Sequence, residues 1–271
     1  MADFTCLTSA VEGHILHIQL YRPQKANALN GVLWHEIRQV FVWADRNPEV
    51  RVILLSGAGK YFCAGIDFEL IGTVFEEVNA LAPGRKEERL RQLIVDLQEA
   101  FTALEACRKP VLAAVHGLCL GAGLDLIAAC DMRYASREAK FSLKEVDLGI
   151  VADVGSLQRL PRLMGEGLVR ELAFTGREME AGEAQSLGLV NRVFDNPQEL
   201  LAGVRALART IAAKSPLTVR GIKEVMNYNR DHSVADGLRY VAALNSALLL
   251  SADCQEAVLA AMEKRPPEFP D

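Results

Sequence analysis

Apolar residues in the first half of the chain fall into short runs with two different periods. Residues 4–20 alternate between apolar and polar side chains around a turn at 12–13, which predicts a β-hairpin. The unbroken aliphatic runs at 52–55 and 111–115 are typical of strands that are buried on both faces. Helical spacing predicts a helix that ends at Asn47 and Pro48 and shows one apolar face, formed by Leu33, Ile37, Val40, Phe41 and Ala44.

Further along the chain, apolar residues recur at helical spacing in two places, residues 90–104 and residues 196 onward. Apolar residues spaced from Leu90 to Leu104 predict a long amphipathic helix, whereas the mixed residues 72–86 predict a mobile surface loop. From residue 196 onward the strand signals disappear and the spacing is helical throughout. We therefore divide the chain into an α/β core, residues 1–195, and a helical C-terminal region, residues 196–271, that serves assembly.

A run of strand, small-residue turn and helix occurs twice, at 52–68 and at 111–130. This repeated alternation favours an α/β fold with largely parallel strand pairing. In the second copy, Gly121, Ala122 and Gly123 precede a helix start that carries Asp125. The turn has the residues of neither a phosphate loop, a dinucleotide fingerprint nor a nucleophile elbow. Its free backbone N–H groups indicate a site for a carbonyl oxygen, with an acid beside it.

The amino-acid composition argues against several kinds of partner for this protein. The 271 residues carry 30 basic and 35 acidic side chains, a net charge of −5, which does not favour nucleic acid or an anionic membrane surface as a partner. No apolar stretch is long enough to cross a bilayer. The six cysteines form no Cys-x-x-Cys pair and are expected to be reduced, and no targeting segment is evident, so we expect a cytoplasmic protein. The histidines lack metal-ligand spacing, so no metal is expected, and His116 is interpreted as structural.

The order of motifs resembles the crotonase (enoyl-CoA hydratase/isomerase) superfamily over essentially the whole chain. The resemblance implies a crotonase-type β/α spiral core, acyl-CoA thioester substrates with no further cofactor, and homo-trimers or hexamers built through the C-terminal helices. The matching segments are Arg22-Pro23, 27–29, 62–67, 109–135, 141–149, 158–161, Thr175-Gly176, Ala184 and 188–190.

A narrower resemblance, to the Δ3,5-Δ2,4-dienoyl-CoA isomerase branch, lies in residues 144–155 and 230–234 together with Asp125. It implies that Glu145 exchanges the proton next to the thioester carbonyl, that Asp153 exchanges the distal proton, and that Asp125 supports them. From the residues alone, Asp153 is also a good helix N-cap. Asp147 is expected to face away from Glu145 through β-alternation.

The resemblance also implies the binding groups. The backbone N–H groups of Ile66 and Ala122 would form an oxyanion hole, although the family usually has glycine at the second position. The remaining residues implied to contact substrate or CoA are Lys25, Ala26, Ala64, Gly65, Asp67, Phe68 and Gly121. No phosphate contact can be assigned, and Arg22 or Lys60 could equally be solvated surface charges.

Two other functions remain open at this point. In a hydratase, Glu145 and Asp125 would activate water and Asp153 would only cap a helix. In a non-catalytic scaffold or CoA- or RNA-binding protein, the acids would be relict. Asp153 discriminates between isomerase and hydratase, and we favour the isomerase.

Overall fold

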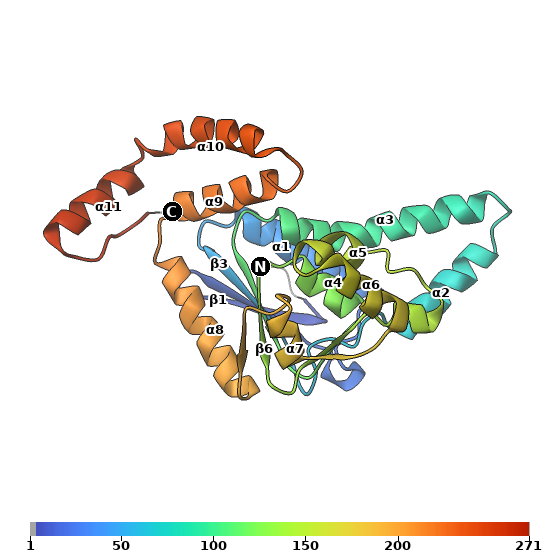
Figure 1. The fold of residues 1–271 in the computed structure, drawn as a ribbon. Coiled ribbons are helices and arrows are strands. Elements are labelled where there is room, and N and C mark those ends of the chain that lie inside the picture. Colours follow the sequence, from blue (N-terminus) through green and yellow to red (C-terminus); the bar gives the residue numbers. More distant parts are fainter. Residues whose placement is uncertain (1–3, 271) are drawn as a thin grey trace.

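The computed structural model describes residues 4–270, and its centre is a six-stranded sheet (Figure 1). The spatial order is β1-β2-β3-β4-β6-β9. β1 and β2 pair in antiparallel register, and each later neighbour pairs in parallel, which confirms the predicted hairpin and the largely parallel pairing. The strand bounds are Leu7–Glu12, Ile15–Leu20, Val52–Gly57, Val111–Val115, Met132–Ser136 and Arg192–Phe194, in that order.

A smaller sheet lies beside the first and carries the turn of the second strand–turn–helix unit. It consists of β5 (Leu118–Leu120), β7 (Lys140–Ser142) and β8 (Met179–Glu180) in the order β5-β7-β8. Its first strand leads directly into α4 (Ala122–Ala128), which is buried along its whole length. The small sheet therefore fixes where this helix begins.

Both faces of the large sheet are covered, as the aliphatic runs predict. Alternate residues of β3, Val52 and Leu54, pack against α8 (Pro197–Ala212), while Ile53 and Leu55 face the main core. The main core also contains side chains of α4, α1 (Gly31–Arg46) and the end of α3 (Arg85–Ala106). In Figure 1 these helices lie on the face of the large sheet opposite α8. The remaining short helices are α5 (Ser156–Arg159), α6 (Glu166–Thr175) and α7 (Ala181–Ser186).

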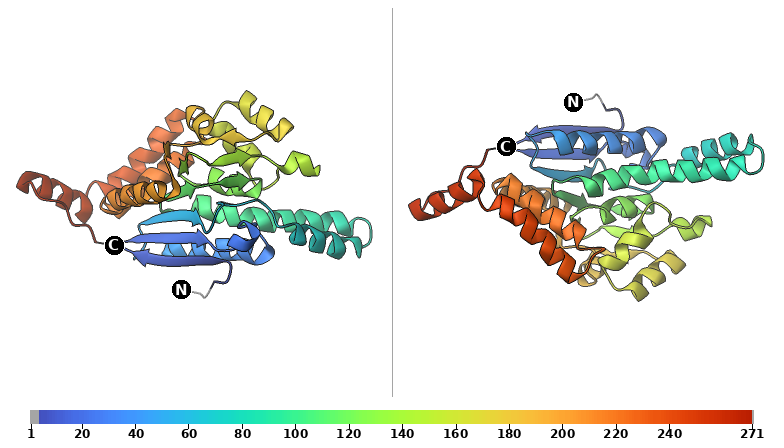
Figure 2. Two further views of the ribbon diagram at one scale, coloured as in Figure 1. Left: turned by 90° about the horizontal axis from the view of Figure 1, so that it is seen from below. Right: turned by 90° about the horizontal axis from the view of Figure 1, so that it is seen from above.

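The prediction of a loop over residues 72–86 is wrong for its first half. Residues Phe68–Asn79 form α2, whose N-cap Asp67 accepts a hydrogen bond from the N–H of Glu69 at 3.0 Å. Leu70 packs on the core and Val78 is buried. The cap and these few apolar contacts outweigh the mixed composition. Together α2 and α3 protrude from one side of the molecule (Figure 2).

Beyond α8 the chain is helical, as predicted, with α9 (Pro216–Tyr228), α10 (Val234–Leu248) and α11 (Ala252–Glu263). Figure 2 shows α11 projecting away from the core, on the side opposite α2 and α3. The division of the chain at residue 195 stays a prediction, since α8 packs on the sheet of the core. Among the described residues, no helix is both long and apolar enough to cross a membrane.

Candidate active site

Two turns from different strand–turn–helix units meet at the edge of the small sheet. Cys63 and Cys119 form a parallel β-bridge, in which the N–H of Cys63 donates to Leu118 and the N–H of Leu120 donates to Cys63, both at 3.0 Å. Gly123 is packed so closely on Cys63 that a β-carbon there would lie 3.1 Å from its Sγ. The turns are therefore held side by side by backbone contacts.

Each turn presents one backbone N–H beyond this bridge. Ile66 follows Gly65, which has φ +98°, and Ala122 is the first residue of α4. Within residues 4–270, neither the N–H of Ile66 nor that of Ala122 donates to an acceptor. The backbone of Ala122 is close enough for its nitrogen to lie 3.8 Å from a β-carbon on Gly65. Two free donors beside one another are the arrangement that an oxyanion requires.

These donors border a cavity of about 310 Å³. Both Glu145 and Asp153 line it, so the structure brings the two predicted proton-transfer residues into one space. Of the predicted binding residues, Ala64, Gly65, Phe68 and Gly121 also line it. The apolar part of the wall is formed by side chains that include Trp34, Ile66, Leu97, Leu148, Ile150 and Val154.

Glu145 opens a short 3₁₀ helix, Glu145–Leu148. Burial raises the pKa of its carboxyl to about 7, and the neighbouring charge of Asp125 acts in the same direction. Its Oε2 atom is buried and has no hydrogen-bond partner among the described residues. Glu145 is therefore poised to gain and lose a proton near neutral pH.

Asp125 lies in the first turn of α4 and is fully buried. Its Oδ1 accepts a hydrogen bond of 2.5 Å from the N–H of Ser156, the first residue of α5. Burial raises its pKa to about 6, against the hydrogen bonds from Ser156 that lower it. Asp125 does not line the cavity. It acts on the site through its charge, which raises the pKa of Glu145, and through its hydrogen bond to the start of α5.

Asp153 lies in the segment before α5 and is half-buried, and burial raises the pKa of its carboxyl. The interpretation of Asp153 as a helix cap is wrong. The helix begins at Ser156 behind Gly155, and the carboxyl that accepts from its first N–H belongs to Asp125. Asp153 is therefore free of a capping role and faces the cavity instead.

Asp147 was expected to face away through β-alternation, but residues 145–148 form a 3₁₀ helix. Its carboxyl borders the cavity and pairs with Lys144 at 3.0 Å, half-exposed to solvent. Because this carboxyl is paired with Lys144 and half-exposed, we assign it no part in proton transfer.

The remaining predicted residues, Lys25, Ala26 and Asp67, do not line the cavity. Lys25 is exposed and pairs with Glu69 at 2.8 Å, and the carbonyl of Ala26 accepts from the N–H of Ala64 at 3.0 Å. Asp67 pairs with buried Arg22 at 2.9 Å, so Arg22 is not a solvated surface charge. Sequence reasoning missed this pair, and missed Trp34 and Leu97 in the wall, because partners far apart in the chain leave no periodic signal. Nε2 of His116 donates to the carbonyl oxygen of Gly59 at 2.9 Å, which is consistent with a structural role.

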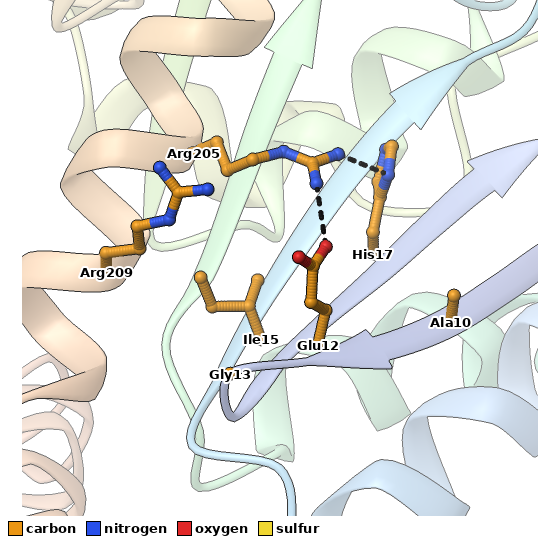
Figure 3. A pocket seen from close by; sticks show the side chains of 7 residues that line it. All are labelled: Ala10, Glu12, Gly13, Ile15, His17, Arg205 and Arg209. Carbon is orange, nitrogen blue, oxygen red and sulfur yellow. Dashed lines mark hydrogen bonds and ion pairs between the residues drawn. The ribbon is translucent and has the colours of Figure 1, made fainter.

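A separate cavity lies between the β1–β2 hairpin and α8 (Figure 3). It holds Arg205, which reaches Glu12 at 3.4 Å and Nδ1 of His17 at 3.3 Å. Burial and the charge of Arg205 lower the pKa of His17 to about 4. None of the three predicted acids lines this cavity, so it is not the candidate site.

Comparison with known proteins agrees with this geometry. A family model described as enoyl-CoA hydratase/isomerase matches residues 10–271. The chain is 48% identical to a peroxisomal Delta(3,5)-Delta(2,4)-dienoyl-CoA isomerase of Arabidopsis thaliana, over 95% of this chain and 93% of the relative. It is 46% identical to the mitochondrial human protein of that name, over 96% of this chain and 79% of the human one.

A solved enoyl-CoA hydratase from Bacillus anthracis superposes with a TM-score of 0.89 at 30% identity, covering 98% of this chain and 99% of that one. The fold expected from the sequence, a crotonase-type β/α core with C-terminal helices, is confirmed by this similarity. The chain belongs to the enoyl-CoA hydratase/isomerase family.

Proposed function

We propose that this protein isomerises 3,5-dienoyl-CoA to 2,4-dienoyl-CoA, a step in the β-oxidation of unsaturated fatty acids. The observation that carries the proposal is the pair of carboxyls, Glu145 and Asp153, in one largely apolar cavity beside two free N–H donors. A hydratase needs only acids that hold a water, whereas moving two conjugated double bonds needs acid/base groups at both ends of the diene. The names of the Arabidopsis and human relatives support the isomerase.

The N–H groups of Ile66 and Ala122 bind the thioester oxygen. Glu145, as carboxylate, removes a proton from C2, and the electron pair spreads through the diene onto the oxygen. Asp153, as carboxylic acid, gives its proton to C6, and the double bonds come to rest at C2 and C4. One proton leaves the substrate and one enters it, so Glu145 ends protonated and Asp153 ionised. Each N–H is worth about 3–4 kcal/mol in such a transition state.

Asp125 supports this exchange without contacting the substrate. Its charge helps to raise the pKa of Glu145, which strengthens that residue as a base near neutral pH. Its bond to Ser156 fixes the start of the helix that follows Asp153. The coenzyme A moiety arrives as part of the substrate, and no other cofactor or metal is needed for either proton transfer.

Assembly into trimers or hexamers is part of the proposal. The three terminal helices and the turn between α10 and α11 expose large apolar side chains, among them Ile222, Met226, Leu238, Leu250 and Met262, and α11 stands away from the core (Figure 2). Apolar faces of this kind mark interaction surfaces. Mass measurement in solution should give a multiple of three chains, and Leu250→Asp should reduce it, whereas Val42→Asp on α1 should not.

The cytoplasmic location also stays a proposal, supported by the six unpaired cysteines. The plant and human relatives are named peroxisomal and mitochondrial. Fractionation of source cells with markers for the cytoplasm and for each organelle decides between these locations.

The proposed activity is tested with purified protein, a 3,5-dienoyl-CoA and, in parallel, a 2-enoyl-CoA. Rapid growth of the ultraviolet absorbance of the conjugated 2,4-dienoyl thioester, lost in Asp153→Asn, with little hydration, supports the isomerase. Fast hydration that Asp153→Asn leaves unchanged would overturn it in favour of a hydratase.

A further inference from the structure

We propose that Gln98, Glu105 and Arg159 are positioning residues that hold the backbone of Asp153, so that its carboxyl meets the distal end of the diene. The inference rests on the proposed function and names groups that act on one of its two proton transfers. Within residues 4–270, no other residue hydrogen-bonds or pairs with the side chain of Asp153, so its position is set through its backbone.

Two side chains hydrogen-bond to the backbone at and after Asp153. Nε2 of Gln98 donates to the carbonyl oxygen of Asp153 at 2.6 Å, and Nη1 of Arg159 donates to the carbonyl oxygen of Val154 at 3.3 Å. A side chain at Gly155 would overlap the guanidinium of Arg159, and Gly155 has φ +131°, a conformation that only glycine adopts readily. Arg159 can therefore fold back over the segment that carries the acid.

Arg159 is itself held in place. Its Nε and Nη2 both donate to Oε2 of Glu105, at 3.0 and 2.8 Å, in a pair that is mostly buried. Burial alone would raise the pKa of Glu105. Arg159 and Arg230 keep this pKa below its ordinary value, because both donate hydrogen bonds to the carboxylate and both carry a positive charge. Glu105 stays ionised, and a paired guanidinium of this kind is a rigid donor.

The cluster lines a second cavity, of about 390 Å³, together with Asp153 and Val154. Gln98 and Glu105 are seven residues apart on α3 and so share one helix face. The segment that carries Asp153 thus separates a polar cavity from the apolar cavity of the active site. Glu145 lies on a different element and makes none of these contacts.

Arg230, in the connection between α9 and α10, also pairs with Glu105. The contacts therefore run from the C-terminal helices through Glu105 and Arg159 to the acid. Because proton transfer requires donor and carbon at near hydrogen-bond reach, a shift of about 1 Å at Asp153 costs roughly a hundredfold in rate.

The test separates the two proton transfers. Isomerisation of 3,5-dienoyl-CoA needs both acids, whereas exchange of the C2 hydrogen for deuterium from solvent needs only Glu145 and the oxyanion donors. Gln98→Ala and Glu105→Gln are each expected to lower kcat for isomerisation by about tenfold or more, with KM and the C2 exchange rate within about twofold of wild type. Gln158→Ala is the matched control, since the side chain of Gln158 lines the second cavity but does not hydrogen-bond to the backbone of Asp153 or Val154.

The variant Asp153→Asn is measured beside them. If wild type does not isomerise 3,5-dienoyl-CoA, the proposed function itself fails. If Asp153→Asn isomerises as fast as wild type, the function stands, but the role of Asp153 and the positioning inference are both overturned. If it loses isomerisation while Gln98→Ala and Glu105→Gln keep the wild-type kcat, only the positioning inference is overturned. Parallel loss of isomerisation and C2 exchange in both variants would also overturn it, because the cluster would then support the whole site and not Asp153.

Discussion

Gly121 and Glu145 are so close that a β-carbon at Gly121 would lie 3.0 Å from Oε1 of the glutamate. Gly121 also has φ +49° and immediately precedes the N–H of Ala122. One backbone position therefore lets Glu145 approach the N–H of Ala122; in the proposed mechanism these two groups act on C2 and the carbonyl oxygen, which are bonded to the same carbon of the thioester.

Gly121→Ala should abolish most of the activity, because the new methyl group pushes the Glu145 carboxylate away and strains the turn. Gly149→Ala is a matched control, since Gly149 has φ +68° with open space around it. Gly149→Ala should lose about 1–2 kcal/mol of stability, because Gly149 has a left-handed helical backbone. Gly121 has φ +49° and ψ −122°, outside that region, so Gly121→Ala should lose more in chemical denaturation. Equal kcat values in the two variants would contradict the account.

The rate should depend on pH through the base. Glu145 must be ionised to accept a proton, whereas isomerisation also needs Asp153 protonated, so the base is isolated by measuring exchange of the C2 hydrogen in Asp153→Asn. The rate of this exchange should rise with pH with a midpoint near the Glu145 pKa of about 7. Asp125→Asn removes the neighbouring charge that raises this pKa but leaves burial in place, and Asn can still accept from Ser156. The midpoint should therefore move down, to between 4.5 and 7. A midpoint unchanged in Asp125→Asn would show that the two carboxyls do not interact.

Stability should depend on pH in the opposite sense. The pKa of Glu145 is raised on folding from 4.5 to about 7, so the folded state keeps a proton that the unfolded state has lost. Its contribution to the free energy of unfolding is complete below pH 4.5 and is lost as pH rises to about 7. Urea denaturation of wild type and Glu145→Gln across this range measures the difference. The stability of the variant relative to wild type should increase with pH, and a constant difference would contradict the raised pKa.

The buried pair Arg22–Asp67 should be structural. Asp67→Asn keeps the cap on α2 but leaves the charge of Arg22 buried without its counter-ion. Breaking a buried pair in this way costs about 3–5 kcal/mol. We expect that loss in denaturation. The exposed pair Lys25–Glu69 serves as the control, where Glu69→Gln should change stability by less than about 1 kcal/mol.

The parts of the fold that the sequence predicts are those set by local pattern. Aliphatic runs such as 52–55 and 111–115 mark strands because each residue must be buried on one face or the other. The helix α2 has an apolar stripe at helical spacing, formed by Phe68, Ile71, Phe75 and Val78. It was missed because the predicted loop began at residue 72, which divides this stripe and leaves a segment of mixed composition.

In the candidate site, too, some residues could be predicted from the sequence and others could not. Glu145 and Asp153 could be named from the resemblance, but Gln98 and Glu105 could not, because their hydrogen bonds with Asp153 and Arg159 join residues more than fifty positions apart. The cap interpretation of Asp153 failed because a buried carboxylate from another helix, Asp125, already occupied that role.

The central claim, that Glu145 and Asp153 serve opposite ends of the diene, is tested most directly by running the reaction in deuterated water and locating the label by NMR. Wild type should place deuterium at C6 of the 2,4-dienoyl product. Asp153→Asn should exchange the C2 hydrogen of the recovered 3,5-dienoyl-CoA without forming product, and Glu145→Gln should do neither. C2 exchange that survives in Glu145→Gln and disappears in Asp153→Asn would reverse the assignment and contradict the account.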